Sequence, residues 1–145
     1  MRGVRHGAEE GQSLVEFALA LPLLLVILLG LADFGRAFYY TSAITNAARV
    51  GAEFAARATV ASPNTTFENQ LKLKVCNETG FVAYNDQTAC NSSPIGVPSP
   101  QFGPGQDAVV TVTYNFSPVS TYLVSRIIGT PTLLLRASAT FPGLN

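Results

Sequence analysis

The chain has 145 residues, of which 48% are hydrophobic and 12% are charged, and this charged fraction is about half that of an ordinary globular domain. Nine basic and nine acidic residues balance to a formal net charge of zero, and Lys and Arg form no dense cluster. Because phosphate binding requires concentrated positive charge, this composition argues against nucleic acid as a main partner.

The hydrophobic residues are concentrated near the amino terminus. An uncharged run extends from Phe17 to Ala32, which is shorter than the ~20 residues that span a bilayer. Including Gln12 to Val15 gives a sufficient length but places Glu16 inside the membrane. A carboxylate at that depth costs about 2.5–3.5 kcal/mol and usually has a partner. Glu16 is therefore the residue that any interpretation of this segment must explain.

Three interpretations of this segment are open. A secretory signal peptide needs a small-x-small cleavage site after the run, but Asp33-Phe34-Gly35-Arg36 follows it. A plain signal anchor fits the length but leaves Glu16 unexplained. The third is a leader cut before the run, between Gly11 and Gln12, which makes Glu16 the fifth residue of the mature chain. Its carboxylate then lies one helical turn from the new amino terminus, or pairs with that of a neighbouring subunit.

The motifs in this region resemble a known family. Gly11, Gln12, Glu16 and Phe17 occupy the positions of the prepilin peptidase processing site of Flp-type pilins. The longer segment 11–58 is similar to TadE-like pseudopilins of tight-adherence pilus systems. Its other specific blocks are Leu21-Pro22, Asp33-Phe34-Gly35-Arg36 and Asn46-Ala47-Ala48-Arg49-x-Gly51-Ala52. The rest of the chain matches that family only loosely.

The resemblance implies a minor pseudopilin that joins, primes or caps a pilus. Its implied partners are prepilin peptidase, other pilins or pseudopilins, pilus assembly proteins and membrane lipid. The implied location is the bacterial inner membrane, with a single pass, a cytoplasmic amino terminus and an extracytoplasmic head, or an extracellular pilus after assembly. We expect a leader at residues 1–11, a transmembrane and extended amphipathic helix at 12–60, and a small head at 61–145.

The helical pattern continues beyond the apolar run, from Asp33 to Ala58. Small residues recur along it and allow another backbone to approach closely; these are Ala47, Ala48, Gly51, Ala52 and Ala55. This stripe contacts either a helix of a neighbouring subunit, which the resemblance favours, or the head of the same chain. Pro22 should kink the helix or leave a carbonyl without its donor. Phe38, Tyr39 and Tyr40 suit an aromatic belt at the membrane surface.

The carboxy-terminal part predicts a small α+β head. Residues 67–76 fit a short helix or a strand, and residues 77–105 are rich in Asn, Ser, Pro and Gly, which is typical of irregular loops. Residues 108–116 and 132–141 alternate apolar and polar side chains, as half-buried strands do, and residues 120–128 suit a short helix. We expect the long helix to continue into this head, with the two strands forming a short antiparallel sheet packed on the helix.

The two cysteines, Cys76 and Cys90, both follow the apolar run. An even number of cysteines in a segment expected outside the cytoplasm favours a disulfide over two unpaired buried thiols. Such a bond would close a loop of about 15 residues and stabilise the fold by about 3 kcal/mol in the chain-entropy model.

Catalytic chemistry has few candidate residues here. The only histidine is His6, which the proposed cleavage removes, so we expect neither a Ser-His-Asp site nor a histidine metal site. We expect no cofactor, and the sequence predicts a structural protein rather than an enzyme. A membrane-anchored binding module that never enters a filament is the alternative, and it should retain residues 1–11.

Overall fold

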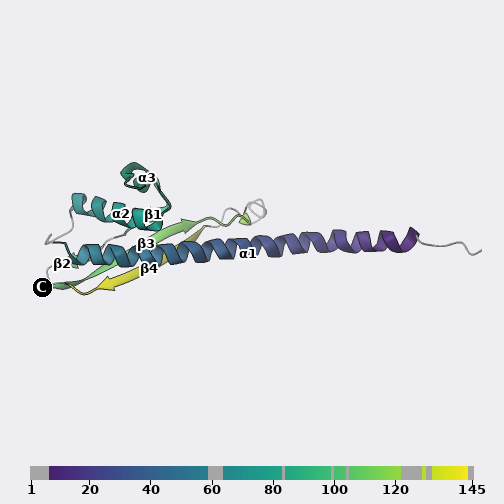
Figure 1. Ribbon diagram of the computed structural model, residues 1–145, viewed down its shortest axis with the longest axis horizontal. Helices are drawn as coiled ribbons and strands as arrows, with labels where there is room; N and C mark the ends of the chain where they lie inside the picture. Colours follow the sequence, from purple (N-terminus) through teal and green to yellow (C-terminus); the bar gives the residue numbers. More distant parts are fainter. Residues whose placement is uncertain are drawn as a thin grey trace, which may run out of the picture.

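A computed structural model shows the long helix and the small α+β head that the sequence predicts. Helix α1 (Gly7–Ala56) is the longest element, and the head gathers along its carboxy-terminal half while its amino-terminal half extends away from the rest of the chain (Figure 1). The structure describes residues 7–58, 64–82, 84–98, 100–103, 105–121, 129 and 132–143.

Helix α1 continues as one element through Pro22. The residues around it are mostly Leu and Ala, which have high helix propensity. Because proline has no N–H group, the carbonyl of Ala18 loses its usual donor at this point. An unpaired carbonyl is one of the two effects that the sequence predicts for Pro22, the other being a kink.

The second and third helices begin at side-chain caps. In α2 (Thr65–Thr79) the Asn64 side chain accepts the N–H of Phe67 at 2.8 Å, and in α3 (Gln87–Ser92) Asp86 accepts the N–H of Ala89 at 2.8 Å. Such caps satisfy donors that the first turn leaves free. Residues 67–76, for which the sequence fits either a helix or a strand, are therefore helical.

Among the described residues the sheet has four strands, β1 (Ile95–Gly96), β2 (Gln101–Gly103), β3 (Gln106–Phe116) and β4 (Leu133–Phe141). Strand β3 pairs antiparallel with β4 along its length, from Ala108↔Phe141 to Phe116↔Leu133. Its other edge carries β1 and β2. The two long strands confirm the prediction, whereas α3, β1 and β2 lie in the stretch predicted to be irregular. Of the short helix predicted at 120–128, residues 122–128 lie outside the described residues.

The core lies where α1 meets both α2 and the sheet. Its largest fully buried side chains include Ile44 from α1, Leu71 and Val75 from α2, and Val110 and Phe116 from β3. This burial follows from the sequence, because Ala108, Val110 and Val112 of β3 point inward and alternate with residues that face outward.

The Cys76–Cys90 disulfide predicted from the sequence is present in the structure and joins the last turns of α2 to α3. Both cysteines are fully buried. A head of this size has a small core, so a cross-link worth about 3 kcal/mol in the chain-entropy model is a substantial share of its stability.

Candidate assembly helix and its junction with the head

The amino-terminal half of α1 has no covering element. Residues 11–32 are exposed throughout, except for a half-buried Leu29. By length and composition, this is the one helix among the described residues that could cross a membrane, and none of its most apolar stretch is buried by the chain itself. A largely apolar, uncovered surface of this length requires lipid or other apolar helices around it.

The predicted processing residues lie on this uncovered half. Gly11, Gln12, Glu16 and Phe17 are all exposed on α1, and a side chain built at Gly11 would meet nothing within 4 Å. Glu16 forms no ion pair with any basic side chain of the described residues. The structure thus leaves the Glu16 carboxylate available to a partner outside this chain, and cleavage after Gly11 stays a prediction.

The small-residue stripe lies elsewhere than the resemblance suggested. Its five residues are all buried in the core of the head; they are Ala47, Ala48, Gly51, Ala52 and Ala55. A Cβ at Gly51 would lie 3.0 Å from Val75 and 3.1 Å from Val110. The assignment of this stripe to a neighbouring subunit is therefore corrected, because α2 and the sheet of the same chain already cover it.

Among the predicted assembly residues, Glu16 and Pro22 alone remain on the uncovered half of α1. The helix therefore divides into an amino-terminal half that is open to partners and a carboxy-terminal half that belongs to the core of the head. The division falls close to Asp33.

Asp33 connects the end of the apolar run to the head. Asp33 is 8% exposed, and its carboxylate accepts the backbone N–H of Val119 at 2.7 Å and that of Ser120 at 2.8 Å. The Arg36 guanidinium lies 3.4 Å away. The pKa of Asp33 is lowered by the Ser120 hydroxyl, by these two N–H groups and by Arg36, although burial opposes the shift. The Asp33 carboxylate, at the end of the head nearest the apolar run, thus has partners for its buried oxygens.

An aromatic cluster lies one to two turns further along α1. Tyr40 stacks on Tyr114 with 4.7 Å between ring centres and meets Phe81 edge to face at 4.9 Å. The Arg36 guanidinium carbon lies 5.4 Å from the centre of the Phe116 ring, within the range of a cation–π contact. Burial raises the pKa of Tyr114, and the neighbouring Tyr40 adds to this effect. The cluster fixes the head against α1.

Of the three residues predicted to form an aromatic belt, Tyr40 instead packs against the head. Phe38 and Tyr39 remain largely exposed. Asp33 and Arg36, which both follow the apolar run, are in contact with each other. Sequence reasoning missed the bonds from Asp33 to Val119 and Ser120. The two segments are more than 80 residues apart, and no local pattern links them.

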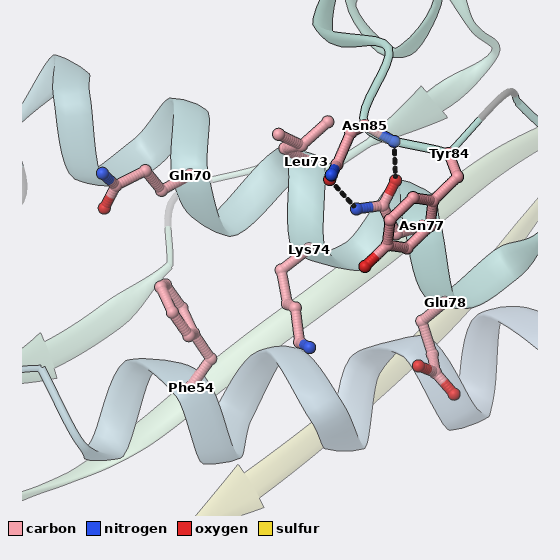
Figure 2. A pocket seen from close by; sticks show the side chains of 8 residues that line it. All are labelled: Phe54, Gln70, Leu73, Lys74, Asn77, Glu78, Tyr84 and Asn85. Carbon is pink, nitrogen blue, oxygen red and sulfur yellow. Dashed lines mark hydrogen bonds between the residues drawn. The ribbon is translucent and has the colours of Figure 1, made fainter.

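A shallow groove lies between α1 and α2 on the side away from the sheet (Figure 2). It has a volume of about 540 Å³. Asn77 and Asn85 close one end through two hydrogen bonds of 2.9 Å. Lys74 and Glu78 give it one charge of each sign, and the Glu78 carboxylate accepts a bond from Asn46 at 2.7 Å. The described residues hold no group of three or more His, Cys, Asp or Glu side chains placed to bind a metal ion.

Removing the Asp33 carboxylate should weaken the attachment of the head to α1 at the end of the apolar run. Asp33→Ala leaves the N–H groups of Val119 and Ser120 without their acceptor, and hydrogen bonds to charged groups contribute about 1.5–3 kcal/mol each. We expect the free energy of unfolding, measured in urea on the detergent-solubilised chain, to fall by about 2 kcal/mol, because water partly replaces the lost acceptor at these N–H groups. Asp107→Ala, at an exposed position of β3, should stay within about 0.5 kcal/mol of the parent.

The same bonds predict a pH dependence. The pKa of Asp33 is lower in the folded chain than in the unfolded chain. The contribution of its carboxylate to folding stability is therefore fully present above the unfolded pKa of about 3.9 and is lost as the pH falls through the pKa of the folded chain. The stability difference between the parent and Asp33→Asn should therefore be constant above about pH 5 and shrink in more acidic solution. A difference that grows on acidification would contradict the assigned bonds.

An uncovered apolar helix long enough to cross a membrane, followed by a small α+β head that contains a disulfide, fits a membrane-anchored protein. The model of one protein family, described as TadE-like protein, matches residues 11–53. This match confirms the resemblance inferred from the motifs of this segment. No curated protein and no solved structure matches the chain.

Proposed function

We propose that the protein is a TadE-like minor pseudopilin, a structural component in the assembly of tight-adherence (Flp-type) pili. In this proposal prepilin peptidase removes residues 1–11, and the mature chain then interacts with other pilins or pseudopilins and with pilus assembly proteins. The amino terminus begins in the cytoplasm and the head lies outside the inner membrane. The role is structural and involves no catalysis.

One observation carries the proposal: the described helix α1 is uncovered along residues 11–32 but buries one face in the head from Ile44 onward. The family match extends across both halves. An apolar helix of this length is stable in a bilayer. After extraction from lipid it needs equivalent apolar neighbours, which the corresponding helices of other pilins supply. The same surface therefore serves first for anchoring and then for assembly.

Glu16 supports assembly over simple anchoring. It is exposed on the uncovered half of α1 and forms no ion pair within the described part of the chain. An intramembrane carboxylate needs a partner. Once residues 1–11 are removed, the positively charged amino terminus of this chain or of a neighbour becomes that partner.

Site-specific photocrosslinking tests this function in intact cells. A photoreactive amino acid at Leu24, which is exposed on the uncovered half of α1, should give adducts with other pilins or pilus assembly proteins. The matched control is Thr140, which is exposed on β4 of the head. A module that only anchors a binding head should give lipid adducts at Leu24 and no pilus protein, and that result would reject the proposed role.

A further inference from the structure

The end of the head nearest the apolar run carries exposed hydrophobic side chains. In the described part of the head, four large hydrophobic residues are highly exposed, and three of them lie at this end: Val119, Leu133 and Leu134. We call these three residues the proximal rim. Leu134 is 64% exposed, although the outward positions that follow it on β4 are polar; they are Arg136, Ser138 and Thr140.

Two contacts fix the level of the rim along α1. The Val119 N–H binds Asp33 at 2.7 Å. Leu133 pairs with Phe116, whose ring centre lies 5.4 Å from the Arg36 guanidinium. The rim is therefore level with residues 33–36, whereas the uncharged run ends at Ala32. At a rise of about 1.5 Å per residue, the rim lies within about 6 Å of the end of that run.

This distance places the rim in the headgroup region of a bilayer. Residues 12–32 form about 31 Å of helix, which matches a hydrocarbon thickness of about 30 Å. The headgroup layer beyond it is about 5–8 Å deep on each side. We propose that the proximal rim is a lipid-contacting surface that seats the head on the outer face of the membrane. The inference rests on the proposed membrane anchoring of α1.

The charges near the rim are compatible with lipid contact. The Asp33 carboxylate is nearly buried and already bound by the two N–H groups and by Arg36, so it presents no free negative charge to phosphate groups. Arg36 keeps 42% of its side chain exposed and can approach lipid phosphate at this level. On α1 itself, Phe34 and Phe38 are exposed beside the same layer, as apolar and aromatic residues are at membrane surfaces.

Depth-dependent fluorescence quenching tests the proposal on the full chain. The sequence contains no tryptophan, so a single tryptophan reports on one position without background. Leu134→Trp probes the rim, and Val119→Trp is a second rim probe if the first variant folds poorly. Tyr84→Trp is the matched control, because Tyr84 is 79% exposed and lines the groove between α1 and α2. Leu24→Trp reports on membrane anchoring. All variants are placed in phosphatidylcholine and phosphatidylglycerol vesicles that contain lipids brominated at defined depths.

We expect the rim tryptophan to be quenched several-fold more than the Tyr84→Trp control, most strongly by bromine near the headgroups, with emission shifted to the blue. Leu24→Trp should respond to deep bromine. If Leu24→Trp is quenched but the rim emits like the control, lipid contact by the rim is overturned while anchoring stands. If Leu24→Trp is not quenched either, anchoring and the rim proposal both fail. A rim signal that changes only with the protein-to-lipid ratio would assign the rim to a second copy and overturn the proposal.

Discussion

Glu16→Ala should still enter the membrane yet fail to co-purify with other pilus components. Removing one partner of a deeply buried ion pair costs about 3–5 kcal/mol, because the remaining charge is left uncompensated. Here the remaining charge is the mature amino terminus. A loss of this size lowers an association constant by a factor of about 100 or more.

Insertion should not suffer from the same change. A carboxylate within the bilayer opposes insertion by about 2.5–3.5 kcal/mol, so its removal makes the free energy of membrane insertion more favourable. Membrane fractionation and pull-down at matched expression separate the two effects. Normal assembly of Glu16→Ala would show that the role assigned to this carboxylate is wrong.

Glu53→Ala is the matched control for this experiment. Glu53 lies on the same helix but within the head, where its carboxylate pairs with Arg57 at 2.6 Å. This is a partly exposed pair, and such pairs contribute about 0–1 kcal/mol. Glu53→Ala should therefore assemble like the parent. Equal loss in both variants would indicate a general fault in α1 rather than a specific partner for Glu16.

Gly51→Leu should destabilise the head strongly. A Cβ at Gly51 would lie 3.0 Å from Val75 and 3.1 Å from Val110, so the further carbons of a leucine have no space between α1, α2 and β3. Overpacking of a core costs about 1–3 kcal/mol and sometimes more. Replacing glycine within a helix returns about 1 kcal/mol, so an overpacking cost at the upper end of that range, about 3 kcal/mol, leaves a net loss of about 2 kcal/mol.

Gly35→Leu provides the control, because a side chain at Gly35 meets nothing within 4 Å. It carries the same change on the same helix and should leave the unfolding midpoint of the unassembled, detergent-solubilised chain unchanged or slightly higher. Urea unfolding followed by tyrosine near-ultraviolet circular dichroism measures both. If Gly51→Leu were as stable as the parent and failed only in assembly, the small-residue stripe would be shown to contact a neighbouring subunit.

The parts of the fold that local pattern determines could be predicted from the sequence. Alternation in residues 108–116 and 132–141 predicts β3 and β4, and their shared apolar face predicts packing on α1. The short elements α3, β1 and β2 could not be predicted in the same way. Strand β1 has two residues and forms only because β3 offers it an edge.

The small-residue stripe shows where the sequence leaves a choice. A row of Ala and Gly allows any backbone or side chain to approach closely, whether it comes from the same chain or from another. Only the three-dimensional arrangement shows that Val75 and Val110 occupy the space at Gly51. The hydrogen bonds that Asp33 accepts from Val119 and Ser120 are non-local in the same sense, because no local pattern of the sequence identifies the loop that binds this carboxylate.

The most direct test of the proposed function is the amino terminus of the mature protein. Intact-mass analysis and amino-terminal sequencing of the membrane-extracted protein, from cells with and without prepilin peptidase, should show a chain that begins at Gln12 only when the peptidase is present. Gly11→Leu should block this processing, because it places a bulky side chain at the proposed cleavage site. It should not disturb the fold, because Gly11 has open space around it. Identical masses in the two strains, with residues 1–11 retained, would contradict the pseudopilin assignment.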